Sequence, residues 1–280
     1  MRKLWLCGSV LAMSLPTLSP IRGLGGPWPS PTSTVHVTVN SRRHYRATGG
    51  EFEGDLPGAT SILKILGLST EGLIKWSANE ERKACLLAAD ELYRSKVRFE
   101  NFPAAIEAKL GAARAHSKLL SKAADIGAET HRAIQSFLSG QMSLDILSPP
   151  AKQAFDSWLA WWTQSGLKPV RVEQVVWDTD LGYAGTVDLV ALTPDGQLEV
   201  WDWKSGKAIY DEYHLQLAAY CHACRGWAPV RPGGIVRLPK YATDPGLEVK
   251  TLGDMYGRQR TEEELMDCFR ALLKVFQVMT

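Results

Sequence analysis

The chain has 280 residues, 45% of them hydrophobic, and a formal net charge of only +2. This length and apolar content are sufficient for a complete hydrophobic core in one large domain. The near-neutral charge excludes a protein that is basic over its whole surface, so nucleic-acid contacts would have to come from local patches.

The first 34 residues differ in composition from the rest of the chain. They are apolar at first and then rich in Pro, Ser, Gly and Thr, which predicts an irregular or disordered leader. The basic start and the apolar run up to Leu15 resemble a short secretory signal. An extended or misassigned start, or a floppy tail, is the interpretation that we favour. No internal repeat or transmembrane span is evident.

The remaining residues predict a single domain over residues 35–280. Two short strands, at 35–39 and 44–47, come first. Alternating charged and apolar positions then predict a helical region from 60 to about 138. Pro149 and Pro150 end that region.

The second half alternates strand-like and helix-like segments, which indicates an α/β fold. We expect the helical region, 60–165, to cover one side of a small mixed β-sheet in a core formed by 166–280, with a cleft at the sheet edge. The expected elements are a helix at 151–164, strands at about 171–177, 183–192 and 197–204, a helix at 211–225, strands at 233–239 and 247–252, and a helix at 262–278.

Three charged residues lie in strand-like sequence that is otherwise almost wholly apolar: Asp188, Asp202 and Lys204. Unpaired charges in such a position are costly. Between the two strands, Pro194-Asp-Gly196 predicts a three-residue hairpin loop, because proline presets the first turn residue and glycine takes the left-handed position.

This loop predicts the register of the hairpin. Thr193 would pair with Gln197, and Asp188 would then sit opposite Asp202, with Lys204 on the same face because side chains alternate along a strand. Directly opposed carboxylates repel each other, so the register favours a divalent cation between them. Two carboxylates, a metal and a lysine are the minimal set for cutting a phosphodiester bond. The alternative is a strand-end Asp188 and a partly exposed Asp202–Lys204 ion pair.

The motifs occur in an order that resembles the PD-(D/E)xK nuclease superfamily, specifically its RecB-like and lambda-exonuclease-like branch of phage and bacterial proteins. The resemblance spans roughly residues 35 to 275, and an early segment from Leu56 to Leu63, followed by Trp76, looks like the helical entry of such proteins. Each motif alone is weak, but five in the right order are strong. They are Gly127 with His131, Glu173, Gly185-x-x-Asp188, Asp202-x-Lys204 and Gln216-x-x-x-Tyr220. The resemblance implies a restriction-endonuclease-like α/β core flanked by helices.

The resemblance also implies a role for each residue. His131, Asp188, Asp202 and the Trp203 carbonyl would be ligands of one or two Mg²⁺ or Mn²⁺ ions, which suit an oxygen-rich set. Lys204 would orient or help deprotonate the attacking water. Gln216 and Tyr220, four positions apart on one helix face, would position the phosphate or hold the lysine. Glu173 would reach a second ion or its water shell. A packed or surface helix histidine is the alternative for His131, and a helix that only packs on the sheet is the alternative for Gln216 and Tyr220.

Local basic patches are the expected route to DNA. One is Arg42-Arg43-His44 with Arg46, and the segment 225–260 holds seven Lys or Arg against three acidic residues. Ordinary solvated surface is the alternative for each. Trp158, Trp161 and Trp162 share one amphipathic helix and are predicted to be core residues rather than a base-stacking platform.

Five cysteines, at 7, 85, 221, 224 and 268, argue against a disulfide framework and for a reducing compartment. Some RecB-like relatives carry an iron–sulfur cluster, with one cysteine before the nuclease motifs and three after. Here Cys221 and Cys224 continue the predicted helix of Tyr220, and Cys268 lies inside the last helix, so buried free thiols are favoured over a cluster.

The resemblance implies a metal-dependent DNA nuclease, acting as an exonuclease on single- or double-stranded DNA in recombination, repair or phage DNA processing. A recombination or replication protein is the expected partner, no membrane is expected, and the cytoplasm is the expected location. Two alternatives stay open: a nuclease-fold subunit that binds DNA without cutting it, and a metal-dependent RNase.

Overall fold

A computed structural model of the chain describes residues 36–40, 44–49, 53–67, 70–112, 114–141, 147–255 and 257–280. The predicted leader, 1–34, and the arginines at 42 and 43 lie outside these residues. Within the described ranges, none of the helices has the length and apolar character needed to cross a membrane.

A five-stranded mixed sheet forms the centre of the molecule, in the order β4-β5-β6-β7-β8. Its strands are β4 (Lys168–Asp178), β5 (Tyr183–Leu192), β6 (Leu198–Lys204), β7 (Val230–Arg237) and β8 (Glu248–Thr251). All neighbours are antiparallel except β6 and β7, which are parallel. A parallel pair needs a crossover, and helix α6 (Asp211–Arg225) supplies it. The predicted mixed α/β sheet is confirmed.

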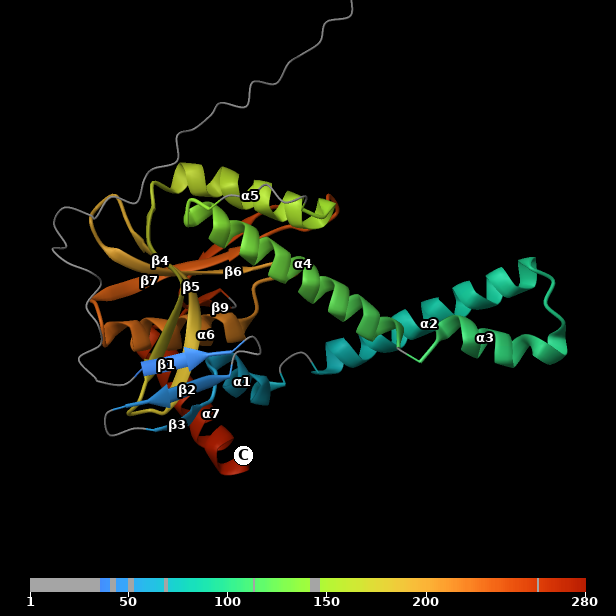
Figure 1. Ribbon diagram of the computed structural model, residues 1–280, viewed down its shortest axis with the longest axis horizontal. Helices are drawn as coiled ribbons and strands as arrows, with labels where there is room; N and C mark the ends of the chain where they lie inside the picture. Colours follow the sequence, from blue (N-terminus) through green and yellow to red (C-terminus); the bar gives the residue numbers. More distant parts are fainter. Residues whose placement is uncertain are drawn as a thin grey trace, which may run out of the picture.

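Helices cover both faces of this sheet (Figure 1). On one face lie α5 (Pro149–Ser165) and the C-terminal half of α4 (Ala115–Leu138); on the other lie α6 and α7 (Glu262–Met279). Pro149 and Pro150 begin α5, because proline is tolerated in the first helical turn, where its missing N–H is not needed.

The prediction that the whole helical region covers the sheet is wrong. The helices α2 (Thr70–Arg94) and α3 (Phe102–Leu110), with the short 3₁₀ turn Phe99–Asn101 between them, project away from the sheet as an arm (Figure 1). Helix α4 starts beside α2 and runs from the arm back to the core. The Glu81 carboxylate on α2 fixes that start, because it accepts a hydrogen bond from the backbone N–H of His116 (3.2 Å).

A small antiparallel sheet lies against β5. It consists of β1 (His36–Val39), β2 (Tyr45–Thr48) and β3 (Gly54–Leu56), the last of which the sequence did not predict. Tyr45 of β2 and Leu56 of β3 are buried against Ala184 of β5.

The remaining short elements lie at the two ends of the domain sequence. The helix α1 (Ala59–Leu63) and the 3₁₀ turn Lys64–Leu66 follow β3, and a hairpin of β9 (Asp254–Met255) and β10 (Arg258–Gln259) precedes α7.

The tryptophan-rich helix α5 forms the core on its side of the sheet. Trp158 is fully buried, stacks on Trp162 with 5.5 Å between ring centroids, and meets Trp203 of β6 edge-on at 5.8 Å. Trp161 contacts Trp201 at 5.2 Å. Both indoles of β6 therefore face α5, which leaves Asp202 and Lys204 to face α6.

Candidate active site

The hairpin between β5 and β6 has the predicted register. The backbone N–H of Thr193 donates to the carbonyl of Gln197 (2.9 Å), Gly196 is left-handed with φ of +81°, and Leu192 pairs with Leu198. Regular pairing ends at Leu189 and Trp201, one position before the two aspartates. Instead of a direct ladder pair with Asp202, Asp188 accepts a hydrogen bond from the backbone N–H of Trp203 (2.8 Å).

The sheet is irregular at Asp188. Val187 packs among the residues under α6 whereas Leu189 packs on the α5 side, although regular alternation would place both on one face. The pairing of β4 with β5 skips Glu173 and Asp188, and Glu173 has a left-handed φ of +49°, which is uncommon for a residue other than glycine. Such strain is typical of functional positions.

This irregularity brings Glu173 and Asp188 to His131 on α4. The His131 Nδ1 atom lies 3.4 Å from Asp188 Oδ1 and 3.9 Å from Glu173 Oε1. One helical turn earlier, Gly127 permits the close approach of α4 to the loop after β6, because a Cβ atom there would lie 2.9 Å from Ser205 Oγ. Two residues before His131, Glu129 accepts hydrogen bonds from the backbone N–H and hydroxyl of Ser148, which fix α4 to the start of α5.

A second group of residues lies around Asp202. Lys204 Nζ is 2.7 Å from Asp202 Oδ2, and the Gln216 amide lies between Asp202 Oδ1 (3.4 Å) and the Tyr220 hydroxyl (2.7 Å). Lys204 and Gln216 therefore contact the Asp202 carboxylate directly, and Tyr220 reaches it through Gln216.

The glycine three positions before Asp188 has a steric reason. The Tyr220 ring lies against Gly185, and a Cβ atom at Gly185 would come within 2.3 Å of that ring. The absence of a side chain at position 185 thus lets Tyr220 approach β5.

Burial and mutual attraction govern the charges of the site. The side chains of Asp188 and Asp202 are only 4% and 2% exposed. Burial opposes a charge on His131, but attraction to Asp188 and hydrogen bonds to Asp188 and Glu173 outweigh it and raise the pKa of His131 to about 10. Burial would raise the pKa of Asp188, but the charge and hydrogen bond of His131 hold it below its usual value. Burial, with repulsion from Asp188, raises the pKa of Asp202 to about 6 against the attraction of Lys204.

The site fits a divalent cation. Among the described residues, one group of ligand atoms lies mutually within 4.8 Å, and it consists of His131, Glu173 and Asp188. Asp202 lies outside this group, and its Oδ2 atom contacts Lys204 without accepting a well-directed hydrogen bond, so one buried carboxylate oxygen has spare capacity. The Trp203 indole packs on the α5 side, and a ligand role for its carbonyl stays a prediction.

Tyr213 lies near the site but was not among the residues predicted from the sequence. The Tyr213 ring lies 5.0 Å from Lys204 Nζ, in a cation–π arrangement. Tyr213, Gln216 and Tyr220 stand at i, i+3 and i+7 on a helix that is otherwise mostly apolar. That polar and aromatic stripe is the signal that could have identified Tyr213.

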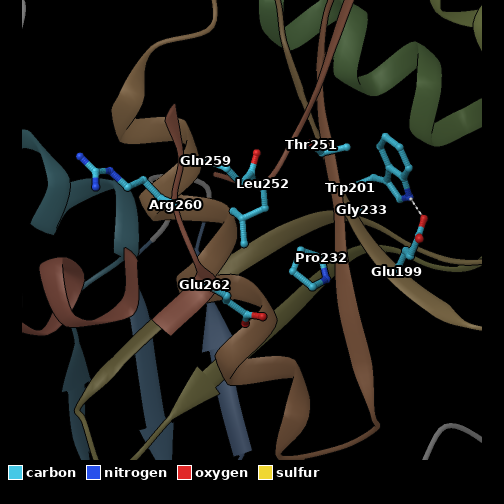
Figure 2. A pocket seen from close by; sticks show the side chains of 9 residues that line it. All are labelled: Glu199, Trp201, Pro232, Gly233, Thr251, Leu252, Gln259, Arg260 and Glu262. Carbon is cyan, nitrogen blue, oxygen red and sulfur yellow. Dashed lines mark hydrogen bonds between the residues drawn. The ribbon is translucent and has the colours of Figure 1, made fainter. Parts of the chain in front are cut away.

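Figure 2 shows a separate cavity of about 430 Å³ at the amino-terminal end of β6. Glu199, Trp201, Pro232 and Arg260 are among its lining residues, and none of the predicted site residues contributes to it. Asp202 and Lys204 lie at the other end of the same strand.

Three of the seven basic residues in 225–260 are engaged in ion pairs. Arg225 pairs with Glu262, Arg231 with Glu199, and the fully buried Arg237 with Glu248. These three arginines hold elements together, and a nucleic-acid role for the basic residues of 225–260 stays a prediction.

The cysteines of the described residues are dispersed. Cys85 is exposed on α2, Cys221 and Cys224 are buried in the core under α6, and Cys268 is exposed on α7. Burial raises the pKa of Cys224 to about 12, as expected for an unreactive core thiol.

A family model described as the PD-(D/E)XK nuclease superfamily matches residues 88–277, a range that includes every residue placed at the site above. None of the curated proteins compared matches the chain.

The contact between Gly185 and Tyr220 gives a first prediction. Gly185→Ala should lower the free energy of unfolding by about 1–3 kcal/mol, the usual cost of overpacking, because the new methyl group meets the Tyr220 ring. Urea denaturation measures this loss. Gly72→Ala is the matched control, since nothing lies within 4 Å of its Cβ, and it should be neutral or slightly stabilising. Equal midpoints for wild type and Gly185→Ala would contradict the packing explanation.

The three-residue ligand group gives a second prediction. Mn²⁺ should raise the melting temperature of the wild type relative to EDTA, because a ligand at 100 times its Kd stabilises a fold by about 2.7 kcal/mol. Asp188→Asn should abolish most of that shift. The control Asp195→Asn, at the hairpin tip, removes an equal charge outside the ligand group and should keep the full Mn²⁺ shift in melting temperature. A full Mn²⁺ shift in Asp188→Asn would remove Asp188 from the ligand set.

Proposed function

Because the chain belongs to the PD-(D/E)XK nuclease superfamily, we propose that it is a DNA exonuclease that hydrolyses phosphodiester bonds with Mg²⁺ or Mn²⁺. Membership of the superfamily suggests a metal-dependent nuclease. The proposal adds three points: that the substrate is DNA, that cleavage is exonucleolytic, and that the ion is Mg²⁺ or Mn²⁺. One observation supports it above all: the ion pair of buried Asp202 with half-buried Lys204, contacted by Gln216, lies on the strand next to the group of His131, Glu173 and Asp188.

Residues of both groups would hold the ion or ions. His131, Glu173 and Asp188 supply one histidine nitrogen and two carboxylates, and Asp202 and the Trp203 carbonyl are the remaining oxygen donors. A bound divalent ion would lower the pKa of a water molecule and offset negative charge on the phosphate.

The chain itself provides the positive charge next to the reacting phosphate. The Lys204 ammonium group contacts both Asp202 and the Tyr213 ring, so these contacts fix the position of the ammonium before the substrate binds. From there it orients the attacking water and stabilises the charge that develops on the phosphoryl oxygens. Water adds to phosphorus, the bond to the leaving ester oxygen breaks, and that oxygen takes up a proton.

Gln216 and Tyr220 act through Asp202. The Gln216 amide bridges Asp202 Oδ1 and the Tyr220 hydroxyl, which restricts the rotation of the carboxylate that holds Lys204. This intact arrangement favours an enzyme over a DNA-binding subunit without activity, since such a subunit has no need of a lysine paired with a buried carboxylate. We place the enzyme in recombination, repair or phage DNA processing.

Cleavage of end-labelled DNA tests the proposal. The wild type should degrade linear DNA with Mg²⁺ or Mn²⁺, leave closed circles intact, and stop in EDTA. Lys204→Ala should reduce the rate by about 10²–10³-fold, the usual loss when a group that stabilises the transition state is removed. Lys168→Ala, an exposed lysine on β4, is the matched control and should be fully active. Near-normal cleavage by Lys204→Ala would refute the site.

The same assay separates the related activities. Cutting of closed circles would indicate an endonuclease, and binding without cleavage under every metal would indicate a scaffold. Competition between DNA and RNA of matched sequence distinguishes a deoxyribonuclease from an RNase, and stronger inhibition by the RNA would overturn the choice of DNA.

A further inference from the structure

Two loops leave the central sheet at the end where Lys204 lies. Strands β6 and β7 are parallel neighbours, and the backbone N–H of Leu238 donates to the carbonyl of Lys204 (2.8 Å). The loop 205–210 after β6 and the loop 238–247 after β7 therefore start side by side. In open α/β sheets, ligands bind at the carboxyl ends of the strands.

Each loop carries a lysine. Lys207 is exposed and Lys240 is partly buried. Burial lowers the pKa of Lys240, Asp244 opposes this effect, and the charge of Lys207 adds to it. Two lysines on loops that start side by side, at the end of β6 where Lys204 lies, are suited to an anion with several oxygens.

The loop after β7 is fixed before any ligand binds. The Asp244 carboxylate accepts hydrogen bonds from the backbone N–H groups of Lys240 (2.8 Å) and Tyr241 (3.0 Å). At the other end of the loop, the buried Arg237 donates to the carbonyls of Pro245 and Gly246 and to Glu248. A preorganised loop loses little conformational entropy on binding.

An exposed aromatic ring stands one side chain away from Lys204. Tyr210 is 41% exposed at the start of α6, and its ring meets Tyr213 edge-on with 5.6 Å between centroids. Tyr213 in turn lies 5.0 Å from Lys204 Nζ. The ring of Tyr210 is thus separated from the catalytic ammonium by a single side chain.

We propose that Tyr210, Lys207 and Lys240 form a subsite that holds a single-stranded stretch of the substrate beside the scissile phosphate. The lysines bind backbone phosphates, and Tyr210 stacks on one base. An aromatic face is available only to a base that has left a duplex, so the subsite selects an unpaired strand. This inference rests on the proposed nuclease function and specifies the form of its substrate.

The salt dependence of binding tests the lysines. Fluorescence anisotropy with a labelled single-stranded oligonucleotide in EDTA measures affinity without cleavage. Each phosphate contact on a single strand contributes about −0.7 to the slope of log K against log salt concentration, so the double variant Lys207→Gln, Lys240→Gln should have a slope shallower by about 1.4. The control, Lys168→Gln with Lys274→Gln, removes two exposed lysines from β4 and α7 and should keep the wild-type slope.

Substitutions at Tyr210 test the stacking. Tyr210→Ala should weaken binding of the single strand roughly 5- to 160-fold, the range for loss of one base–aromatic stack, whereas Tyr210→Phe should bind as the wild type does. A blunt duplex of the same sequence should bind more weakly than the single strand and should not respond to Tyr210→Ala. Equal weakening by Ala and Phe, or equal loss for the duplex, would overturn the stacking role.

The outcomes also separate this inference from the proposed function. If the wild type cleaves DNA and Lys204→Ala does not, but Lys207→Gln with Lys240→Gln keeps the wild-type salt slope, the subsite is refuted and the nuclease stands. A wild type that neither binds nor cleaves nucleic acid refutes both.

Discussion

Two buried carboxylates in the middle of an apolar sheet are the constraint on which the rest of this structure depends. A charge at such depth is tolerated only with partners, and each aspartate draws them from different elements. Asp188 is held by His131 of α4 and the backbone of β6, and Asp202 by Lys204 of its own strand and Gln216 of α6. The helices on both faces of the sheet are thereby tied to the same pair of charges.

The sheet loses regularity where these charges meet. Glu173 adopts a left-handed conformation, the pairing of β4 with β5 skips one position, and the alternation of side chains in β5 slips by one at Asp188. Strain of this kind costs about 1–3 kcal/mol per residue and persists only when the surroundings enforce it. Here they do, because the residues on both sides of the slip are fully buried in separate apolar clusters. The core stabilises the fold strongly enough to hold an unfavourable local arrangement that brings three ligand side chains together.

The parts of this arrangement that depend on short-range sequence patterns could be predicted from the sequence. The Pro-Asp-Gly loop and the two-residue period predicted the hairpin register, and the bounds of β5 and α6 agree with the expected 183–192 and 211–225. The motif order, read through the family resemblance, brought His131, Glu173 and Gln216 into consideration. The left-handed conformation of Glu173 and the break in side-chain alternation at Asp188 could not be predicted, because both depend on how β4 packs against β5 and α4. The arm of α2 and α3 was missed for a related reason: charged and apolar positions predict a helix but not the surface on which it packs.

Strand β6 shows why the register matters so much. Its side chains alternate between two different environments: Trp201 and Trp203 fill the core below α5, while Asp202 and Lys204 face α6. A slip of one residue would turn both indoles toward the polar site and bury an aspartate and a lysine among the tryptophans of α5. Such a state loses the burial of two large aromatic side chains and leaves charges unpaired, so it is strongly disfavoured on both counts. The contrast between the two faces of β6 therefore makes its register unambiguous, and the same contrast places the charged pair at the end of the strand where both loops emerge.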